Sequence, residues 1–140
     1  MGSYMNCRVE LVEEKLDPSS AFEEFMTANQ SRAIASYVGI VQGEVAAIHY
    51  QMLRSQFEEI VKKTCIQVGR GLRMVWALHR VGLVPKGEAV SFMAVAADHQ
   101  SEALEMITLL TKTVRGASIL VKELLLEEGK TKIVNGHEVS

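Results

Sequence analysis

The chain has 140 residues, a length typical of one domain, and 48% of them are apolar, which is enough to build a substantial core. Only 6% are aromatic, so we expect a mainly aliphatic core. The formal charge of -2 argues against nucleic acid or an anionic membrane surface as the partner. The composition therefore predicts one domain over residues 1–140, with residues 1–5 left outside the fold.

The cysteine pattern and the absence of long apolar runs narrow the class further. Cys7 and Cys65 form neither a C-x-x-C motif nor a metal-ligand spacing, and Cys65 falls on the apolar face of an expected helix, as a core thiol would. No apolar run approaches the roughly 18 residues that cross a bilayer, and residues 1–5 do not resemble a secretory signal. We therefore expect a cytoplasmic protein with no metal, no cofactor and no membrane contact.

The first half of the chain is predicted to hold three strands and two helices. Residues 6–12 form a β-like run, and a helix follows with Asp17 as its cap and Pro18 in its first turn. Apolar, β-branched stretches predict strands over 33–41 and 45–50. Residues 53–68 form the clearest helix, because apolar residues recur at i, i+4, i+7 and i+8.

The second half adds strands around one more long helix. We expect a strand over 72–81, a turn or loop over 82–87, and a central strand over 89–97, which is apolar enough to be covered on both faces. Asp98 is placed to cap a helix that closes at Gly116, and two final strands follow over 119–126 and 132–134. This order predicts an α+β fold of the two-layer sandwich type.

A set of motifs between residues 72 and 123 carries a family resemblance. The segment H-R-V-G at 79–82 is followed by P-K-G-E at 85–88, an apolar strand, and a helix that opens with D-H-Q at 98–100. Upstream, a strand with Gly39 ends at Gln42. This order resembles the large, catalytic subunit of molybdopterin synthase, which shows H-R-x-G, P-x-G-(D/E) and a His-Arg helix start. The resemblance covers roughly residues 33–134.

The resemblance implies a fold, an activity and partners. The fold would be an α/β hammerhead with an added antiparallel sheet. The activity would be sulfur transfer in molybdenum cofactor biosynthesis, from the thiocarboxylated C-terminal glycine of a small ubiquitin-like subunit to a cyclic pyranopterin monophosphate, which yields the dithiolene. The large subunit would form a homodimer that carries a small subunit at each end, giving a heterotetramer.

Five residues are candidates for binding the pterin substrate. His99 matches the family's active-site histidine at a helix start, where free N–H groups favour phosphate. Gln100 and Gln42 stand where the family has arginine, so they keep hydrogen bonding but lose charge. Arg80 is a further anion candidate, whereas its neighbour His79 is either a site residue or a satisfied core histidine. Lys130, after the turn at Gly129, is a candidate for the family's second lysine or else a surface charge.

Lys122 is the candidate catalytic residue. The family's catalytic lysine is the first of two basic residues before Glu, which in this register falls on Val121, and Lys122 matches the second. Since a strand alternates faces, Lys122 takes over the role only if a local bulge turns it, and otherwise it is a solvated strand residue.

Two further classes of protein are also consistent with this sequence. Gln42, Gln100 and Val121 all remove positive charge from one site, which favours a non-catalytic relative that acts as a binding or assembly protein. The other class is a small α+β ligand-binding or regulatory domain whose motifs are coincidental.

Overall fold

The computed structural model describes residues 6–116, 121–126, 129 and 131–135. In chain order these residues form β1 (Asn6–Val12), α1 (Pro18–Thr27), β2 (Ala33–Ile40), β3 (Val45–Gln51), α2 (Arg54–Val68), β4 (Leu72–Arg80), β5 (Gly82–Pro85), β6 (Ala89–Ala97), α3 (Gln100–Gly116), β7 (Val121–Leu126) and β8 (Thr131–Asn135). This confirms the predicted α+β class. None of the helices in this part of the chain has the length and apolar character needed to cross a bilayer.

Four strands form a central sheet in the order β1-β4-β6-β2. Strand β1 runs parallel to β4, while β4 and β2 are antiparallel to β6. All nine residues of β6 are buried, as predicted for a central strand covered on both faces.

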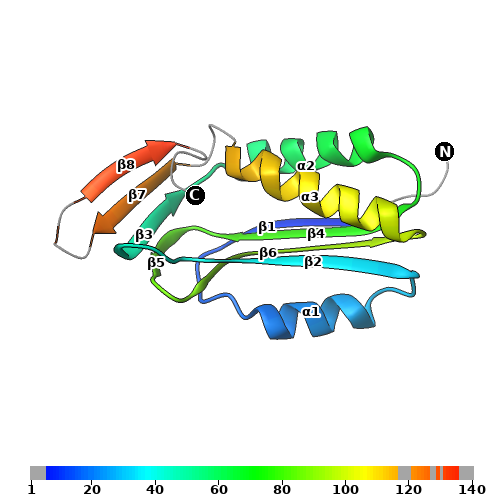
Figure 1. Cartoon of the computed structure of the whole chain (residues 1–140), viewed down its shortest axis with the longest axis horizontal. Helices are drawn as coiled ribbons and strands as arrows, with labels where there is room; N and C mark the ends of the chain where they lie inside the picture. The colour runs from blue at the N-terminus through cyan, green and yellow to red at the C-terminus, as the bar shows by residue number, and fades with distance from the viewer. Residues whose placement is uncertain (1–5, 117–120, 127–128, 130, 136–140) are drawn as a thin grey trace.

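Helices cover both faces of the central sheet (Figure 1). Helices α2 and α3 lie on one face, over the larger core, and α1 lies on the other, where Phe25 meets the ring of Trp76 edge-on at 5.2 Å. Because strand residues alternate between faces, Trp76 packs toward α1 and its neighbour Val75 packs toward α2. Helix α1 thus adds a third layer to the expected two.

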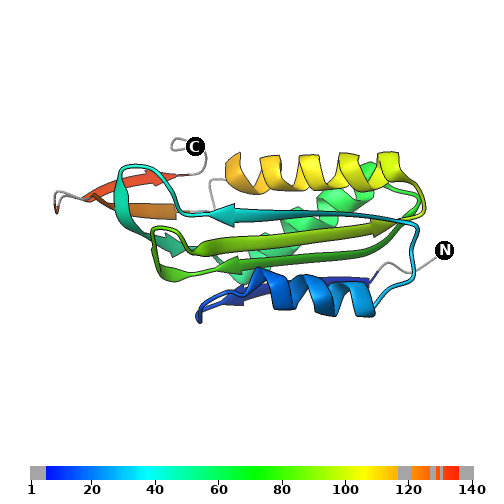
Figure 2. The ribbon, with the colours of Figure 1, turned by 60° about the horizontal axis from the view of Figure 1, so that its bottom comes forward.

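The remaining strands form an end sheet in the order β5-β3-β7-β8. Figures 1 and 2 show it extending beyond one end of the central sheet. Its strand pairs are all antiparallel. The expected additional antiparallel sheet is therefore present. Strand β7 was predicted from residue 119, but residues 117–120 lie outside the described part of the chain.

The prediction of a turn or loop over 82–87 is wrong for its first four residues. Residues Gly82–Pro85 form β5, which pairs with β3, and Val84 is fully buried. The flanking Gly and Pro suggested a turn, but a partner strand some 35 positions away supplies the hydrogen bonds. Pro85 is tolerated because β5 is an edge strand, where one N–H need not be paired.

The two predicted helix caps have different outcomes. The Asp17 carboxylate accepts hydrogen bonds from the N–H groups of Ser19 and Ser20 at 3.1 and 3.3 Å, as an N-cap does. Asp98 instead accepts two hydrogen bonds from the guanidinium of Arg73, and α3 begins only at Gln100. The bidentate arginine on β4 therefore takes the carboxylate that was predicted to cap α3.

Candidate functional site

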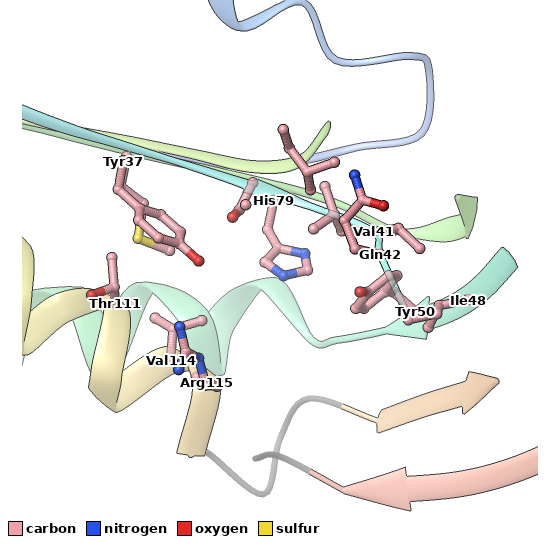
Figure 3. Close-up of a pocket in the computed structure, with 14 residues that line it drawn as sticks. Tyr37, Val41, Gln42, Ile48, Tyr50, His79, Thr111, Val114 and Arg115 are labelled. Carbon is pink, nitrogen blue, oxygen red and sulfur yellow. The ribbon is translucent and has the colours of Figure 1, made fainter. Parts of the chain in front are cut away.

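A pocket of about 210 Å³ opens where the central sheet meets the end sheet, beside the C-terminal end of α3 (Figure 3). Its walls come from β2 and the residues that follow it, from β3, β4 and β6, and from the last turns of α3. Strands from both sheets therefore converge on one cavity. Its polar lining consists of Tyr37, Gln42, Tyr50, His79, Ser91, Thr111 and Arg115.

The described lining of this pocket carries positive charge and no negative charge. Among the described residues that line it there is one arginine, Arg115, and no aspartate or glutamate. Arg115 stands in the last turn of α3, where the helix end carries partial negative charge that would repel an anion. The guanidinium offsets that charge, so the pocket suits an anionic or a neutral polar group rather than a cation.

His79 lies at the centre of the pocket wall and is almost fully buried. Its Nδ1 lies 2.8 Å from the carbonyl oxygen of Arg80, and since a carbonyl only accepts, we assign the proton to Nδ1. The rings of Tyr50 and Phe57 meet the imidazole edge-on, with centroids 5.4 and 6.2 Å away. His79 is thus held by the core and also faces the pocket, so both interpretations from the sequence apply to it.

Tyr50 supplies a hydroxyl that stays protonated. Burial raises the pKa of Tyr50 to about 12, and the neighbouring Tyr37 adds to the effect. Figure 3 shows the two tyrosines on opposite sides of His79. At neutral pH both the Tyr50 hydroxyl and the Gln42 amide can therefore donate hydrogen bonds to a bound group.

Gly39 lets two pocket strands approach each other closely. A Cβ atom at this position would lie 2.5 Å from the Ser91 Oγ and 3.4 Å from the ring of Tyr37. Gly39 and Ser91 are cross-strand partners in β2 and β6. The glycine of the family-like strand is therefore required by packing at the pocket wall.

Lys122 is placed next to this pocket by strand pairing. In β7 its Cα is opposite that of Tyr50, and Val121 is opposite Gln51. The β3–β7 pairing is regular from Val121 to Leu125, so the described strand contains no bulge at Lys122. The bulge that was expected to turn Lys122 is therefore absent. Position 122 is a candidate for a different reason, since it is the one of the two that pairs with a pocket residue, Tyr50.

Arg80 lies outside the pocket lining and is already engaged. Its guanidinium forms an ion pair with Glu88 at 2.7 Å and donates to the carbonyl oxygen of Leu83 at 3.4 Å. The side chain is largely buried. This pair joins the H-R and P-K-G-E segments, so their spacing has a structural cause.

His99 and Gln100 lie at the other end of the molecule. Gln100 opens α3 and Arg115 lies 15 residues later, so they stand about 22 Å apart along the helix at 1.5 Å rise per residue. His99 borders a shallow depression with Arg32 and Asp98. Within one protomer, His99 and Gln42 therefore lie far apart. Lys130 lies outside the described residues, and no group of three or more potential metal ligands occurs among the residues that the structure describes.

Sequence reasoning missed Arg115, Tyr37, Tyr50 and Thr111. Thr111 and Arg115 are four residues apart and thus share one side of α3, a signal that was available. The sequence does not show which end of the sheet this side of the helix packs against. These features define an α+β protein with a polar pocket at the junction of two sheets, whose described lining contains no aspartate or glutamate.

Comparison with known proteins assigns the family. The family model described as MoaE protein matches residues 11–115, which is most of the chain. The molybdopterin synthase catalytic subunit of Caulobacter vibrioides is 27% identical over 104 residues, covering 69% of this chain and 69% of that protein. The chain belongs to the MoaE protein family, and this excludes coincidental motifs.

Solved structures confirm the fold. A molybdopterin biosynthesis MoaE protein from Burkholderia ambifaria superposes with a TM-score of 0.78 at 18% identity, covering 96% of this chain and 92% of that one. The complex of subunits 1 and 2 of molybdopterin-converting factor from Helicobacter pylori contains a chain that matches with a TM-score of 0.74 at 17% identity, covering 94% and 92%. The hammerhead-like expectation is therefore met at the level of the fold.

Proposed function

We propose that this chain is the large, sulfur-transferring subunit of a molybdopterin synthase in molybdenum cofactor biosynthesis. It would act in the cytoplasm with a small ubiquitin-like subunit, and its substrate would be the cyclic pyranopterin monophosphate. The observation that carries the proposal is the pocket at the sheet junction. In a family whose relatives are named as this catalytic subunit, it joins Gln42, His79 and Arg115 beside the position of Lys122.

The chemistry of the pocket fits both reactants. The thiocarboxylate is an anion and the pterin carries an anionic phosphate. The described lining, with Arg115 and no acidic residue, therefore avoids repulsion of either group. The Tyr50 hydroxyl and the Gln42 amide offer hydrogen bonds to the polar edge of a pterin. In this proposal Lys122 acts on the reacting carbon as the thiocarboxylate sulfur bonds to it. Water then cleaves the acyl–sulfur bond, which leaves a carboxylate on the glycine of the small subunit.

The remaining candidates need a second copy of the chain. His99 and Gln100 cannot reach this pocket within one protomer, since the whole of α3 lies between them and Arg115. We propose a homodimer within a heterotetramer, in which His99 of one protomer serves the pocket of its partner. The small-subunit complex of the H. pylori relative supports the heteromeric part of this assembly.

The test is reconstitution with a thiocarboxylated small subunit and the cyclic pterin precursor, with dithiolene product as the readout. Lys122→Ala and Arg115→Ala should each lower kcat/KM by at least about tenfold, because each removes a charge that acts in the transition state. Lys63→Ala is the matched control, since Lys63 is an exposed lysine of α2 whose partner among the described residues is Glu59 at 3.8 Å. Full activity of both pocket variants would rule out this site.

The second candidate is a non-catalytic relative that binds the small subunit. The neutral residues at 42, 100 and 121 favour it, because the family carries positive charge at those positions. Under this alternative the wild-type chain forms a complex with the small subunit, measured by calorimetry, but yields no dithiolene. Product formed by the wild-type chain would exclude it.

A further inference from the structure

Two cysteines far apart in the sequence share one face of the central sheet. Cys7 lies in β1, where its Cα is opposite that of Val75 in β4. Val9 and Val75 belong to the core beneath α2 and α3, while Arg8 stacks over Trp76 on the α1 side at 4.6 Å. Since strand residues alternate, Cys7 faces α2.

Cys65 approaches the same spot from the helix. It lies on the buried face in the last turn of α2, which ends at Val68, and the chain returns as β4 from Leu72. The last turn of α2 therefore lies over the start of β4, beside Cys7. Cys65 belongs to the same buried cluster as Val9 and Val75, the residues that flank and face Cys7 in the sheet. Lys62, one turn earlier on α2, adds positive charge near the Cys7 sulfur.

The two thiols have different surroundings. Cys7 is exposed on an edge strand, while Cys65 is buried in the core with 5% of its surface accessible. A hydrogen bond with Cys65 lowers the pKa of Cys7 to about 7, with Lys62 contributing and desolvation opposing. The same bond raises the pKa of Cys65, and burial adds to it. An accessible thiolate beside a second thiol is the arrangement of a redox-active pair.

We propose that Cys7 and Cys65 form a redox pair that hydroperoxides oxidise to an intrachain disulfide. The Cys7 thiolate attacks one oxygen of hydrogen peroxide, releases hydroxide and becomes a sulfenic acid. The Cys65 sulfur then attacks the Cys7 sulfur, the S–O bond breaks, and the hydroxyl leaves as water with the Cys65 proton. The two sulfurs together lose two electrons, and the peroxide gains them.

The fold permits the movement that bond formation requires. Bond formation requires the two sulfurs to come within about 2 Å of each other. Among the described strands, β1 lies at the sheet edge and pairs with β4 alone, so it can shift toward α2 without breaking a second described ladder. This site lies on a different part of the fold from the pocket and is independent of sulfur transfer.

The experiment treats the full chain with a small molar excess of hydrogen peroxide near neutral pH. We expect the intact mass to fall by two hydrogens, and a non-reduced digest to contain the Cys7 and Cys65 peptides linked. Dithiothreitol should restore the original mass.

Four variants assign the steps. Cys65→Ala should stop at the Cys7 sulfenic acid, which dimedone traps, and Cys7→Ser should leave Cys65 unoxidised because it is buried. Lys62→Ala should slow iodoacetamide alkylation of Cys7 several-fold at neutral pH. Lys63→Ala, which changes a neighbouring lysine paired with Glu59, should leave that rate unchanged.

Three results would overturn the proposal. One is wild-type protein that keeps both thiols under conditions that fully oxidise glutathione. Another is a Cys7-linked covalent dimer in place of the intrachain bond. The third is an alkylation rate of Cys7 in folded wild-type protein equal to that of a free cysteine peptide, a measurement that does not depend on any variant folding.

Discussion

At least one pocket residue offers hydrogen bonds where the resembled family has a charged side chain. Gln42 offers an amide where the family resemblance places an arginine, and Arg115 is the basic residue of the described lining. A neutral amide binds a phosphate oxygen more weakly than a guanidinium does, because it lacks both the charge and the two-pronged geometry. At the residue scale, the proposed anion binding in this pocket therefore depends mainly on Arg115 and on groups brought by neighbouring elements.

Gly39 gives a prediction about packing at the same wall. Gly39→Ala places a methyl group 2.5 Å from the Ser91 Oγ, so Ser91 must move within a buried strand. We expect a loss of roughly 1–3 kcal/mol in the free energy of unfolding, measured by urea denaturation.

Ser91 supplies the matched control for this prediction. Ser91→Ala removes the atom that clashes, so the double variant Gly39→Ala/Ser91→Ala should recover most of the lost stability relative to Ser91→Ala alone. Equal losses in the presence and absence of the Ser91 hydroxyl would show that steric contact with Oγ is not the cause.

At the scale of elements, strand pairing decides which residues reach the site. Strand β3 contributes to both the pocket and the end sheet, because Tyr50 lines the cavity while its backbone pairs with β7. A one-residue change of the β3–β7 register would place Val121 instead of Lys122 opposite Tyr50. The candidate catalytic position thus depends on an alignment of two strands some seventy residues apart in the chain.

Helix α1 gives a prediction at this scale, through its cap. Hydrogen bonds from Ser20, from both its hydroxyl and its N–H, hold the pKa of Asp17 below its usual value, with Ser19 contributing. A depressed folded-state pKa means that the stabilisation is present above the ordinary value of about 3.9 and is lost as pH falls through the folded value.

Asp17→Ala should therefore lower the Tm by a few degrees at pH 7, and this difference from wild type should shrink on acidification below about pH 4. Circular dichroism melts at several pH values measure it. Glu14→Ala, at an exposed acid in the preceding loop, is the control and should show no comparable loss. A difference that persists unchanged into acid would contradict the capping explanation.

In the whole molecule, the candidate residues of the pocket lie far from those at the start of α3. The pocket lies at the junction of the sheets and His99 lies at the far end of α3, so the proposed assembly requires that each site be completed by the partner protomer. This arrangement makes a prediction for mixed dimers that a single-chain site does not make.

His99→Ala and Arg115→Ala should each impair dithiolene formation, and mixing them in equal amounts with subunit exchange should restore activity at about a quarter of the sites. One intact pocket then meets one intact His99 in each mixed dimer. Coexpression with two affinity tags provides the mixed dimer in pure form. No recovery in that dimer would place His99 outside the partner's pocket, and a fully active His99→Ala variant would remove it from the site.

The sequence by itself determined the elements and the family-like motifs. Local patterns predicted both long helices from spaced apolar residues, β6 from its continuous apolar run and the Asp17 cap from the Asp-Pro pair, because these depend on residues close together in the chain. It also placed Cys65 in the core. Local patterns are sufficient where the stabilising contacts are local or where burial is uniform along an element.

Tertiary structure decided what those patterns left open. Strand β5 exists because β3 pairs with it, and Asp98 binds Arg73 instead of capping α3. Packing of α2 against β1 brings the strand of Cys7 and the helix of Cys65 together. The pocket collects residues from five elements whose relative placement is fixed by packing, and this packing separates His99 from Gln42 by the length of α3. Contacts between distant segments have no signature in a local pattern, so only the folded chain determines them.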